Sequence, residues 1–457
     1  MSTTIYALAS GAGRAGVAVV RISGPSAGTA LMTLMGADLP PVRSAKLVRL
    51  RDPQSGETLD DALVLWFAGP ASFTGEDVAE LHIHGGLAVI DGVLASLSSL
   101  PDLRLAEPGE FTRRAFDNAK LDLTQVEGLA DLIEAETQAQ RKQALRQAEG
   151  VLGKLYDGWR ERLVRFLAHF EAELDFSDED LPEHLHIAVV DGVRVLQSEL
   201  RAHLDDGRRG ERLRAGVRLA IIGPPNAGKS SLMNALAQRD AAIVSDIAGT
   251  TRDVVEVHLN LAGYPLLVAD TAGLRQSGDA IEQEGVRRAR SWAHTADLKL
   301  AVFDGTSLPI LDATTRELLE QDTLVVINKS DARAVDFPKQ IDGHEVWPLS
   351  VKTGAGLDAL LTRLTQMVAQ RCRDVNDGPA PTRARHRESL ERTIEALNRF
   401  LAKDQMVDNV EAIPSYPGSE LEAEDLRLAA RELGRITGRV DVEDLLDVIF
   451  RDFCIGK

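Results

Sequence analysis

The segment Gly223-Pro-Pro-Asn-Ala-Gly-Lys-Ser230 fits the pattern G-x-x-x-x-G-K-S/T. It directly follows the apolar run Val217–Ile222 and precedes a helical pattern that begins near Ser231. Between a strand and a helix, the glycines of such a loop let backbone N–H groups surround a phosphate. The lysine then neutralises charge on the β- and γ-phosphates, and the serine hydroxyl can ligate Mg²⁺. This segment therefore predicts a nucleotide-binding P-loop domain.

The sequence around this loop alternates between short apolar runs and helical patterns, which is typical of a mainly parallel sheet. The expected strands are Val217–Ile222, Val254–Leu261, Pro265–Asp270, Leu298–Asp304, Thr323–Asn328 and Glu345–Leu349.

Three further motifs follow in the order that a guanine-nucleotide switch requires. Asp270-Thr-Ala-Gly273 ends a strand, where its carboxylate can hold Mg²⁺ through water and its glycine N–H can meet the γ-phosphate. Asn328-Lys-Ser-Asp331 ends another strand, and the carboxylate of Asp331 can accept from N1–H and the 2-amino group of guanine. Ser350-Val-Lys352 suits the loop that closes on the base. Adenine lacks that donor pair, so the sequence predicts GTP rather than ATP.

The stretch Ser245–Asp253 lies between the P-loop and Asp270 and fits a first switch, with Thr251 as a Mg²⁺ ligand beside Ser230. The residues expected to bind GTP are Asn226, Ala227, Gly228, Lys229, Ser230, Ser231, Ser245, Asp246, Ile247, Ala248, Gly249, Thr250, Thr251, Asp270, Thr271, Ala272, Gly273, Asn328, Lys329, Asp331, Ser350, Val351 and Lys352.

The residues expected to act in catalysis are Asn226, Lys229 and Glu282. The sequence lacks the groups that usually orient the water and stabilise the transition-state charge. Many GTPases orient the attacking water with a glutamine after D-T-A-G, but Leu274 stands there, and the P-loop contains no arginine finger. The carbonyl oxygen of Asn226, with backbone carbonyls of residues 245–250, can form an oxygen cage for an alkali cation. We expect K⁺ in place of the arginine. Glu282 can hold the water, although a solvated switch-helix residue is an equally good interpretation from composition.

The remaining sequence suggests two other kinds of domain. Residues 1–118 are expected to form an α+β domain with one helix, Leu87–Leu100. Its expected strands are the short β-branched runs Gly16–Ile22, Ala45–Leu50, Ala62–Phe67 and Val78–Ile83. Apolar residues at three- and four-residue steps make residues 119–213 and 379–457 helical. We expect one helical domain in two parts, with the G domain of residues 214–378 inserted between them.

Composition limits the compartment and the partners. The chain has 457 residues, a net charge of −18, 44% hydrophobic residues and two cysteines, Cys372 and Cys454. We expect a protein of the reducing cytoplasm, with no signal peptide and no run of about 20 apolar residues to span a membrane. An acidic chain is not a general nucleic-acid coat. Arginines within 208–214 and 383–387 are either local RNA contacts or, more simply, solvated helix ends.

Over essentially its full length the chain resembles the MnmE (TrmE) family of tRNA-modification GTPases. The matching segments, beside the G-domain motifs, are Ser72-Phe-Thr-Gly-Glu-Asp77, His84-Gly-Gly86, Pro108-Gly-Glu-Phe-Thr-Arg113, Lys120-Leu-Asp-Leu123 and Phe453-Cys-Ile-Gly-Lys457. The resemblance implies a multidomain α/β and α fold. Its parts are an N-terminal α+β folate-binding and dimerisation domain, a split helical domain and an inserted Ras-like P-loop G domain.

The resemblance also implies ligands and partners. A tetrahydrofolate derivative (5-formyl or 5,10-methylene) is expected at Arg21, Glu80, Lys120 and Lys457. K⁺ is expected at Asn226, Ser245, Ile247 and Thr250, with GTP hydrolysed through dimerisation of G domains in a homodimer. A heterotetramer with the flavoprotein MnmG is expected to add a carboxymethylaminomethyl or aminomethyl group to C5 of the wobble uridine of certain tRNAs. Cys454 is the family's C-terminal cysteine, with no role fixed by the sequence.

Three other classes of protein fit the sequence less well. A ribosome-assembly GTPase of the Era or Der type shares the G motifs, but it requires a basic RNA-binding module or a second G domain, and the sequence contains neither. A one-carbon transferase with an idle nucleotide site, or a structural scaffold, leaves the complete switch motifs without a purpose.

Overall fold

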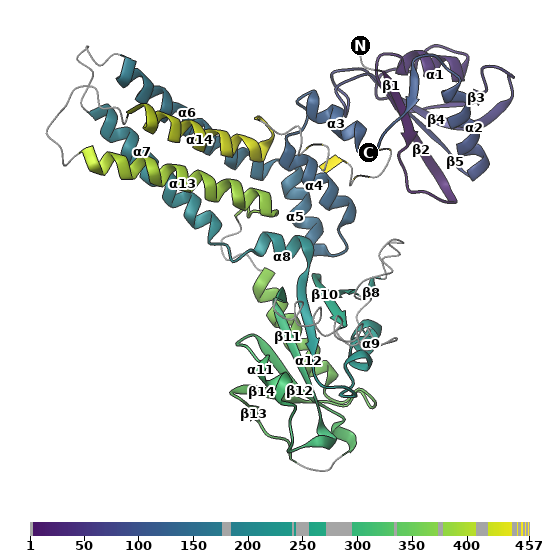
Figure 1. Ribbon diagram of the computed structural model, residues 1–457. Coiled ribbons are helices and arrows are strands. Elements are labelled where there is room, and N and C mark those ends of the chain that lie inside the picture. Colours follow the sequence, from purple (N-terminus) through teal and green to yellow (C-terminus); the bar gives the residue numbers. More distant parts are fainter. Residues whose placement is uncertain are drawn as a thin grey trace, which may run out of the picture. The chain divides into compact units, whose positions relative to one another are not determined.

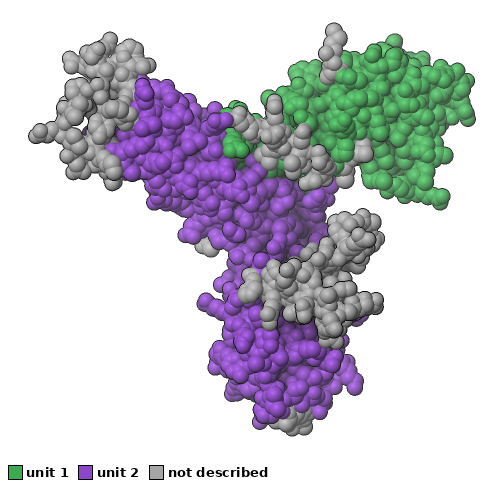
Figure 2. Space-filling model, viewed as in Figure 1, with its two compact units in different colours: residues 1–130, 153–158, 433–457 green, residues 131–152, 159–432 purple. Residues whose placement is uncertain are grey.

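The computed structural model describes residues 3–175, 184–239, 242–243, 256–270, 295–332, 336–372, 378–407 and 419–440, with residues 446, 449–450, 453 and 456. The chain divides into two compact units (Figure 2). Unit 1 contains residues 1–130, 153–158 and 433–457, and unit 2 contains residues 131–152 and 159–432.

Unit 1 is built on a six-stranded sheet with the order β3-β4-β5-β2-β1-β6, antiparallel except for the pair β1 and β6. Helices α1 and α2 pack their apolar side chains on one face of it, against Val20, Ile22, Leu81 and Ile83. The elements are β1 (Thr4–Leu8), β2 (Ala15–Ser23), α1 (Ala27–Met35), β3 (Lys46–Arg51), β4 (Thr58–Phe67), β5 (Val78–Gly85), α2 (Leu87–Ser98) and β6 (Leu103–Leu105).

This arrangement confirms the predicted α+β class of the N-terminal region. Four of its strands and α2 occur where the apolar runs predicted them, with ends shifted by a few residues. The prediction omitted β1, α1 and β6. Strand β1 has only five residues and β6 only three, so neither offers enough alternation to distinguish a strand from a loop.

The C-terminal segment of the chain belongs to unit 1. Leu446, Phe450 and Phe453 share an apolar cluster with Leu123 and Val126 of α4 (Leu123–Glu134). Two glycines allow this close packing. Gly109, before α3 (Glu110–Asp117), has φ +68°, and a Cβ there would lie 2.5 Å from the carbonyl oxygen of Phe450. Gly456 has φ +100° and lies against the carbonyl of Leu8. The two ends of the chain therefore meet in one unit.

Unit 2 contains the predicted mainly parallel sheet, which has eight strands in the order β13-β14-β12-β11-β7-β10-β9-β8. The five strands from β14 to β10 run parallel, and the strands at both edges are antiparallel. The strands are β7 (Val217–Ile222), β8 (Ala242–Ile243), β9 (Glu256–Leu261), β10 (Tyr264–Asp270), β11 (Leu298–Asp304), β12 (Thr323–Asn328), β13 (Gln340–Ile341) and β14 (His344–Pro348).

Apolar side chains cover both faces of this sheet, which is why its central strands read as unbroken apolar runs. One face packs on α9 (Lys229–Arg239) and α12 (Leu357–Cys372). The other face includes Ile222, Phe303 and Ile327. The short helices α11 (Ala313–Glu317), η1 (Gly305–Ser307) and η2 (Ser330–Ala332) lie in the connections between strands.

The split helical domain of the predicted fold class is also present. Phe170 of α6 and Phe400 of α13 meet edge to face with centroids 5.6 Å apart, and Gln197 of α7 donates to Asn398 of α13 at 2.9 Å. Segments far apart in the sequence thus lie side by side (Figure 1). The helices are α5 (Gln138–Ala148), α6 (Val151–Asp175), α7 (His184–Leu204), α8 (Arg209–Ala215), α13 (Ala384–Val407) and α14 (Ser419–Thr437).

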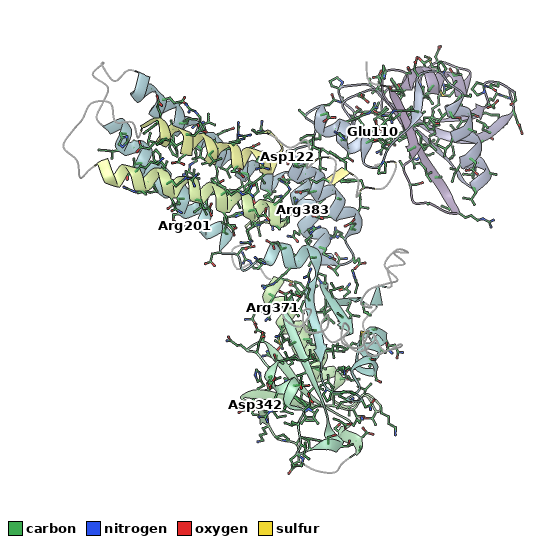
Figure 3. All side chains as sticks on the ribbon, in the orientation of Figure 1. Glu110, Asp122, Arg201, Asp342, Arg371 and Arg383 are labelled. Carbon is green, nitrogen blue, oxygen red and sulfur yellow. The ribbon has the colours of Figure 1, made fainter. Side chains whose placement is uncertain are left out.

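The two arginine-rich runs form ion pairs inside unit 2. Arg212 pairs with Asp297 at 2.6 Å, and Arg387 pairs with Asp206 at 2.6 Å. Arg214 and Arg383 share Asp131, at 3.0 Å and 2.8 Å. Figure 3 labels Arg383 where α13 begins. These four arginines join the helices to one another and to the sheet, so they are ion-paired, partly buried residues rather than the solvated helix ends that the sequence suggested.

The packing at Gly109 makes a stability prediction. Gly109→Ala places a methyl group against the Phe450 carbonyl, whereas Gly36→Ala, at a similar φ of +60°, meets no atom within 4 Å. Both changes carry the left-handed strain of about 1–2 kcal/mol. We expect Gly109→Ala to lower the unfolding midpoint of the full chain clearly further, as measured by scanning calorimetry. Equal midpoints for the two variants would contradict the described packing of the C-terminal segment.

Candidate functional site

The P-loop connects the end of β7 to the start of α9 and lies tightly against the neighbouring strands. Gly223 has φ +151°, and a Cβ there would collide with the carbonyl of Val302 on β11. Gly228 has φ +95°, and a Cβ there would collide with the side-chain amide of Asn328 at the end of β12. Only glycine fits both positions, because each combines a left-handed backbone with a close neighbour.

Lys229 begins α9, and its ammonium group lies over the loop. It is only 9% exposed, and its Nζ donates to the carbonyl oxygens of Gly223 and Pro224, each at 2.9 Å. Asn226 lies at the exposed tip of the loop with a left-handed φ of +62°, and Ser230 is exposed one residue after the lysine. A buried cation and an exposed amide and hydroxyl therefore share one loop, which suits an anionic ligand with its metal ions.

Asn328 joins this loop to the opposite end of the site. Its Nδ2 donates to the carbonyl of Ala227 at 2.8 Å, and its Oδ1 accepts from the backbone N–H of Val351 at 3.2 Å. The side chain is 3% exposed, so both of its polar atoms act inside the protein. A single amide thus connects the P-loop, the end of β12 and the loop after β14.

The carboxylate expected to read guanine is held in place by a neighbouring hydroxyl. Ser350 Oγ donates to Asp331 Oδ1 at 2.6 Å, and the N–H of Thr353 donates to the same hydroxyl at 3.2 Å. The Ser350 hydrogen bond, with the positive charge of Lys352 nearby, lowers the pKa of Asp331 below its usual value. Asp331 is exposed and ionised at neutral pH, so it can accept hydrogen bonds from a ligand.

Lys329 is held at the base of this region by an ion pair that the sequence analysis did not anticipate. It has φ +64°, and its Nζ lies 2.6 Å from Asp304 Oδ2, at the end of β11. Burial raises the pKa of Asp304, but its hydrogen bonds from Lys329 and Thr306 outweigh that and leave the pKa lowered. The signal for Asp304 was available, since an acidic residue ends a buried parallel strand beside β12.

Among the residues predicted to bind GTP, those in the P-loop, at the end of β12 and in the loop after β14 lie at one edge of the sheet. Asp270 ends β10 in register with Ile221 of β7 at the same edge. The others lie outside the described residues: Ser245, Asp246, Ile247, Ala248, Gly249, Thr250, Thr251, Thr271, Ala272 and Gly273. The same holds for Glu282, Cys454 and Lys457.

A second group of predicted residues lies in unit 1, on the sheet face opposite α1 and α2. Arg21 of β2 and Glu80 of β5 are register partners, with Arg21 Nη2 2.9 Å from Glu80 Oε1. The guanidinium carbon of Arg21 lies 5.3 Å from the ring centroid of Phe73 and 5.7 Å from that of Phe111. Lys120 donates to the carbonyl of Pro70 at 3.1 Å and does not join the Arg21–Glu80 pair.

The residues that surround this pair have no role predicted from the sequence. His82 Nε2 lies 3.5 Å from Glu80 Oε2, two residues along the same face of β5. Phe73 and Phe111 lie within segments quoted for the family resemblance, but only the fold brings them to Arg21. Because side chains alternate between the two faces of a strand, the sequence alone could have placed His82 on the same face of β5 as Glu80.

Ser350 provides a pH prediction. Ser350→Ala removes the hydrogen bond that lowers the pKa of Asp331, so that pKa should rise towards its ordinary value. The Asp331 charge would then be lost at a higher pH as the solution is acidified. Carboxyl ¹³C NMR titration of the aspartates measures this, with Thr353→Ala as the control that leaves the Ser350–Asp331 bond intact. An unchanged Asp331 titration in Ser350→Ala would refute the assignment of the cause.

No helix in the described ranges is long and apolar enough to cross a membrane.

Comparison with known proteins gives a consistent family across the chain. The MnmE helical domain family matches residues 123–454, and the family of the GTP-binding protein TrmE N-terminus matches residues 4–120. The tRNA modification GTPase MnmE of Paramagnetospirillum magneticum is 57% identical, with all of both chains aligned. The MnmE protein of Parvibaculum lavamentivorans is 56% identical, covering 99% of this chain and 100% of that protein.

A eukaryotic relative is similar over nearly the same length. The mitochondrial 5-taurinomethyluridine tRNA synthase subunit GTPB3 of Homo sapiens is 50% identical, covering 99% of this chain and 93% of that protein. With two family matches and near-complete coverage of these relatives, the chain belongs to the MnmE (TrmE) family of tRNA modification GTPases.

Proposed function

We propose that this protein hydrolyses GTP and acts in the modification of tRNA. The observation that carries the proposal is that Asn328 donates to the carbonyl of Ala227 at 2.8 Å and accepts from the N–H of Val351 at 3.2 Å, which fixes the P-loop and the base-side loop at one sheet edge. Family membership supports the tRNA role, because the similar proteins are named for tRNA modification.

In this proposal each predicted site residue has a physical task. Lys229 balances the charge of the β- and γ-phosphates from its buried position. Ser230, together with Thr251, holds Mg²⁺. Asp331 accepts from the guanine edge, and Lys352 covers the base side. Bound K⁺ and Mg²⁺ supply positive charge where charge develops at the γ-phosphate. Glu282 holds the attacking water in place of the absent glutamine.

The potassium site is the least usual part of the proposal. Its support is the exposed position of Asn226 at the loop tip, which leaves a neutral oxygen available beside the phosphates. Ser245, Ile247 and Thr250 would provide the other oxygens when two G domains of a homodimer meet.

The folate proposal rests on the Arg21 group in unit 1. Arg21 and Glu80 are each about one-fifth exposed, and two aromatic rings lie by the guanidinium. An ionic pair beside aromatic rings suits a flat heterocycle with polar edges. Gly456, which precedes Lys457, packs on Leu8, and the neighbouring Ala7 is the register partner of Arg21. We propose that Lys120 and Lys457 meet the carboxylates of the tetrahydrofolate derivative.

The complete reaction in this proposal requires a second protein. This chain would supply the one-carbon unit and the GTP-driven step, and the flavoprotein MnmG would join it in a heterotetramer in the cytoplasm. The product would be a carboxymethylaminomethyl or aminomethyl group on C5 of the wobble uridine.

GTP hydrolysis in KCl and in NaCl at equal ionic strength tests the cation mechanism. An arginine finger raises the rate of GTP hydrolysis by about 10³–10⁵-fold. By the same argument, we expect hydrolysis to be at least about tenfold faster in KCl than in NaCl. Asn226→Ala should remove the K⁺ stimulation. Asn260→Ala serves as the matched control, since Asn260 accepts from Gly263 N–H in the β9–β10 turn. Equal rates in the two salts for the unmodified protein would reject the potassium site.

Nucleoside analysis of tRNA tests the wider function. In cells that lack their own MnmE-family protein, this chain should restore the C5-modified wobble uridine seen by mass spectrometry. Asp331→Ala should fail to do so because the guanine contact is lost. Full GTP hydrolysis in vitro without any restored modification would refute the tRNA role and leave the GTPase assignment intact.

A further inference from the structure

A cavity of about 330 Å³ in unit 2 lies between the helical region and the G domain, away from the P-loop. Its walls come from α5, the start of α6, α8, the end of α12, the start of β10 and residues 378–382. Figure 1 shows α5 and α8 next to each other at this junction. The volume falls in the range of about 300–1,000 Å³ that is common for small-molecule sites.

The charged side chains that line this cavity are basic, although the chain as a whole is acidic. Lys142 and Arg146 lie one helical turn apart on α5, and Arg209 joins them from α8. None of the described residues that line the cavity is acidic. Burial, with the charge of Asp297, raises the pKa of the lining thiol Cys372 to about 12, so it stays neutral. A neighbouring cavity is lined by the acidic residues Asp131, Glu134 and Glu136 together with Arg214, so a lining whose described charged residues are all cationic is local to this cavity.

Thr382 gives an independent sign of a ligand. Its side chain lines the cavity and is 2% exposed, yet within the described residues its Oγ1 has no hydrogen-bond partner. A buried hydroxyl without a partner destabilises the folded state. The segment that contains it is fixed, because the carbonyl of Pro381 approaches Gly210 too closely for any side chain. A ligand oxygen in the cavity would satisfy this hydroxyl.

The remaining wall is apolar and partly aromatic. Val151, Leu152 and Leu213 contribute aliphatic surface, and Tyr264 contributes an aromatic ring. A flat ring can stack on tyrosine while anionic oxygens face the three cations and the hydroxyl. We propose that this cavity binds a phosphate ester of a nucleoside, as a free nucleotide or as a residue of an RNA strand. The RNA case rests on the proposed tRNA role, and the free-nucleotide case does not.

The test is titration of the full chain, with its G domain saturated by GDP, with uridine 5′-monophosphate and separately with a short oligouridine RNA. Uridine lacks the guanine donor pair, so the G domain does not compete for it. Lys142→Glu should weaken binding at least about tenfold by reversing a charge in the cavity. Arg141→Glu is the matched control, because it makes the same charge change on the same helix outside the cavity and should stay within about twofold.

Thr382→Val separates a ligand-binding role from a structural one. It keeps the shape of the side chain and removes the unpartnered hydroxyl, so the thermal midpoint should hold or rise while nucleotide affinity falls several-fold. A lower midpoint with unchanged affinity would overturn the proposal. GTP hydrolysis by each variant, which should match the unmodified protein, checks the G domain separately.

The two probes distinguish the sources of the phosphate ester. Binding of both, with the same loss in Lys142→Glu, supports a nucleotide of an RNA strand. Binding of uridine 5′-monophosphate alone supports a free nucleotide. The proposal is overturned if neither probe binds, or if Arg141→Glu weakens binding as much as Lys142→Glu does.

Discussion

The two hydrogen bonds of the Asn328 side chain are the interaction on which the nucleotide site depends. The ends of β7 and β12 bring the P-loop and the base-side loop to one edge of the sheet, but strands alone do not fix the spacing of loops. Asn328 does so by binding Ala227 at 2.8 Å and Val351 at 3.2 Å. Gly228 must be a glycine because that amide lies against it. In the proposed site, the two ends of the nucleotide would therefore meet loops that share one side chain.

In unit 1, strand register rather than a bridging side-chain amide brings the residues of the candidate site together. Pairing of β2 with β5 places Arg21 opposite Glu80, and the ring centroids of Phe73 and Phe111 lie 5.3 Å and 5.7 Å from the guanidinium carbon. Packing of Gly456 on Leu8 brings the far end of the chain to the same sheet. A candidate site assembled from residues so distant in sequence requires the whole unit to fold first.

Much of the G domain was predictable because its signals are local. Strands β7, β11 and β12 occupy the predicted residues, since buried parallel strands are continuous apolar runs that end at recognisable motifs. Contacts between distant residues were not predictable. Nothing in the sequence pairs Asn328 with Ala227, Lys329 with Asp304, or Lys142 and Thr382 with one cavity. The GTP, metal and folate roles of individual residues stay predictions, and the structure adds the geometry in which they can be tested.

Affinity for GDP in Asn328→Ala, measured with a fluorescent GDP analogue, tests the central claim most directly. Loss of both bonds leaves the Ala227 carbonyl and the Val351 N–H without this partner, and this costs about 1–3 kcal/mol of free energy. We expect Asn328→Ala to bind GDP more weakly by about 10- to 100-fold. Asn398→Ala, which removes an asparagine that accepts from Gln197 in the helical region, should bind as the unmodified protein does. Unchanged GDP affinity in Asn328→Ala would contradict the account.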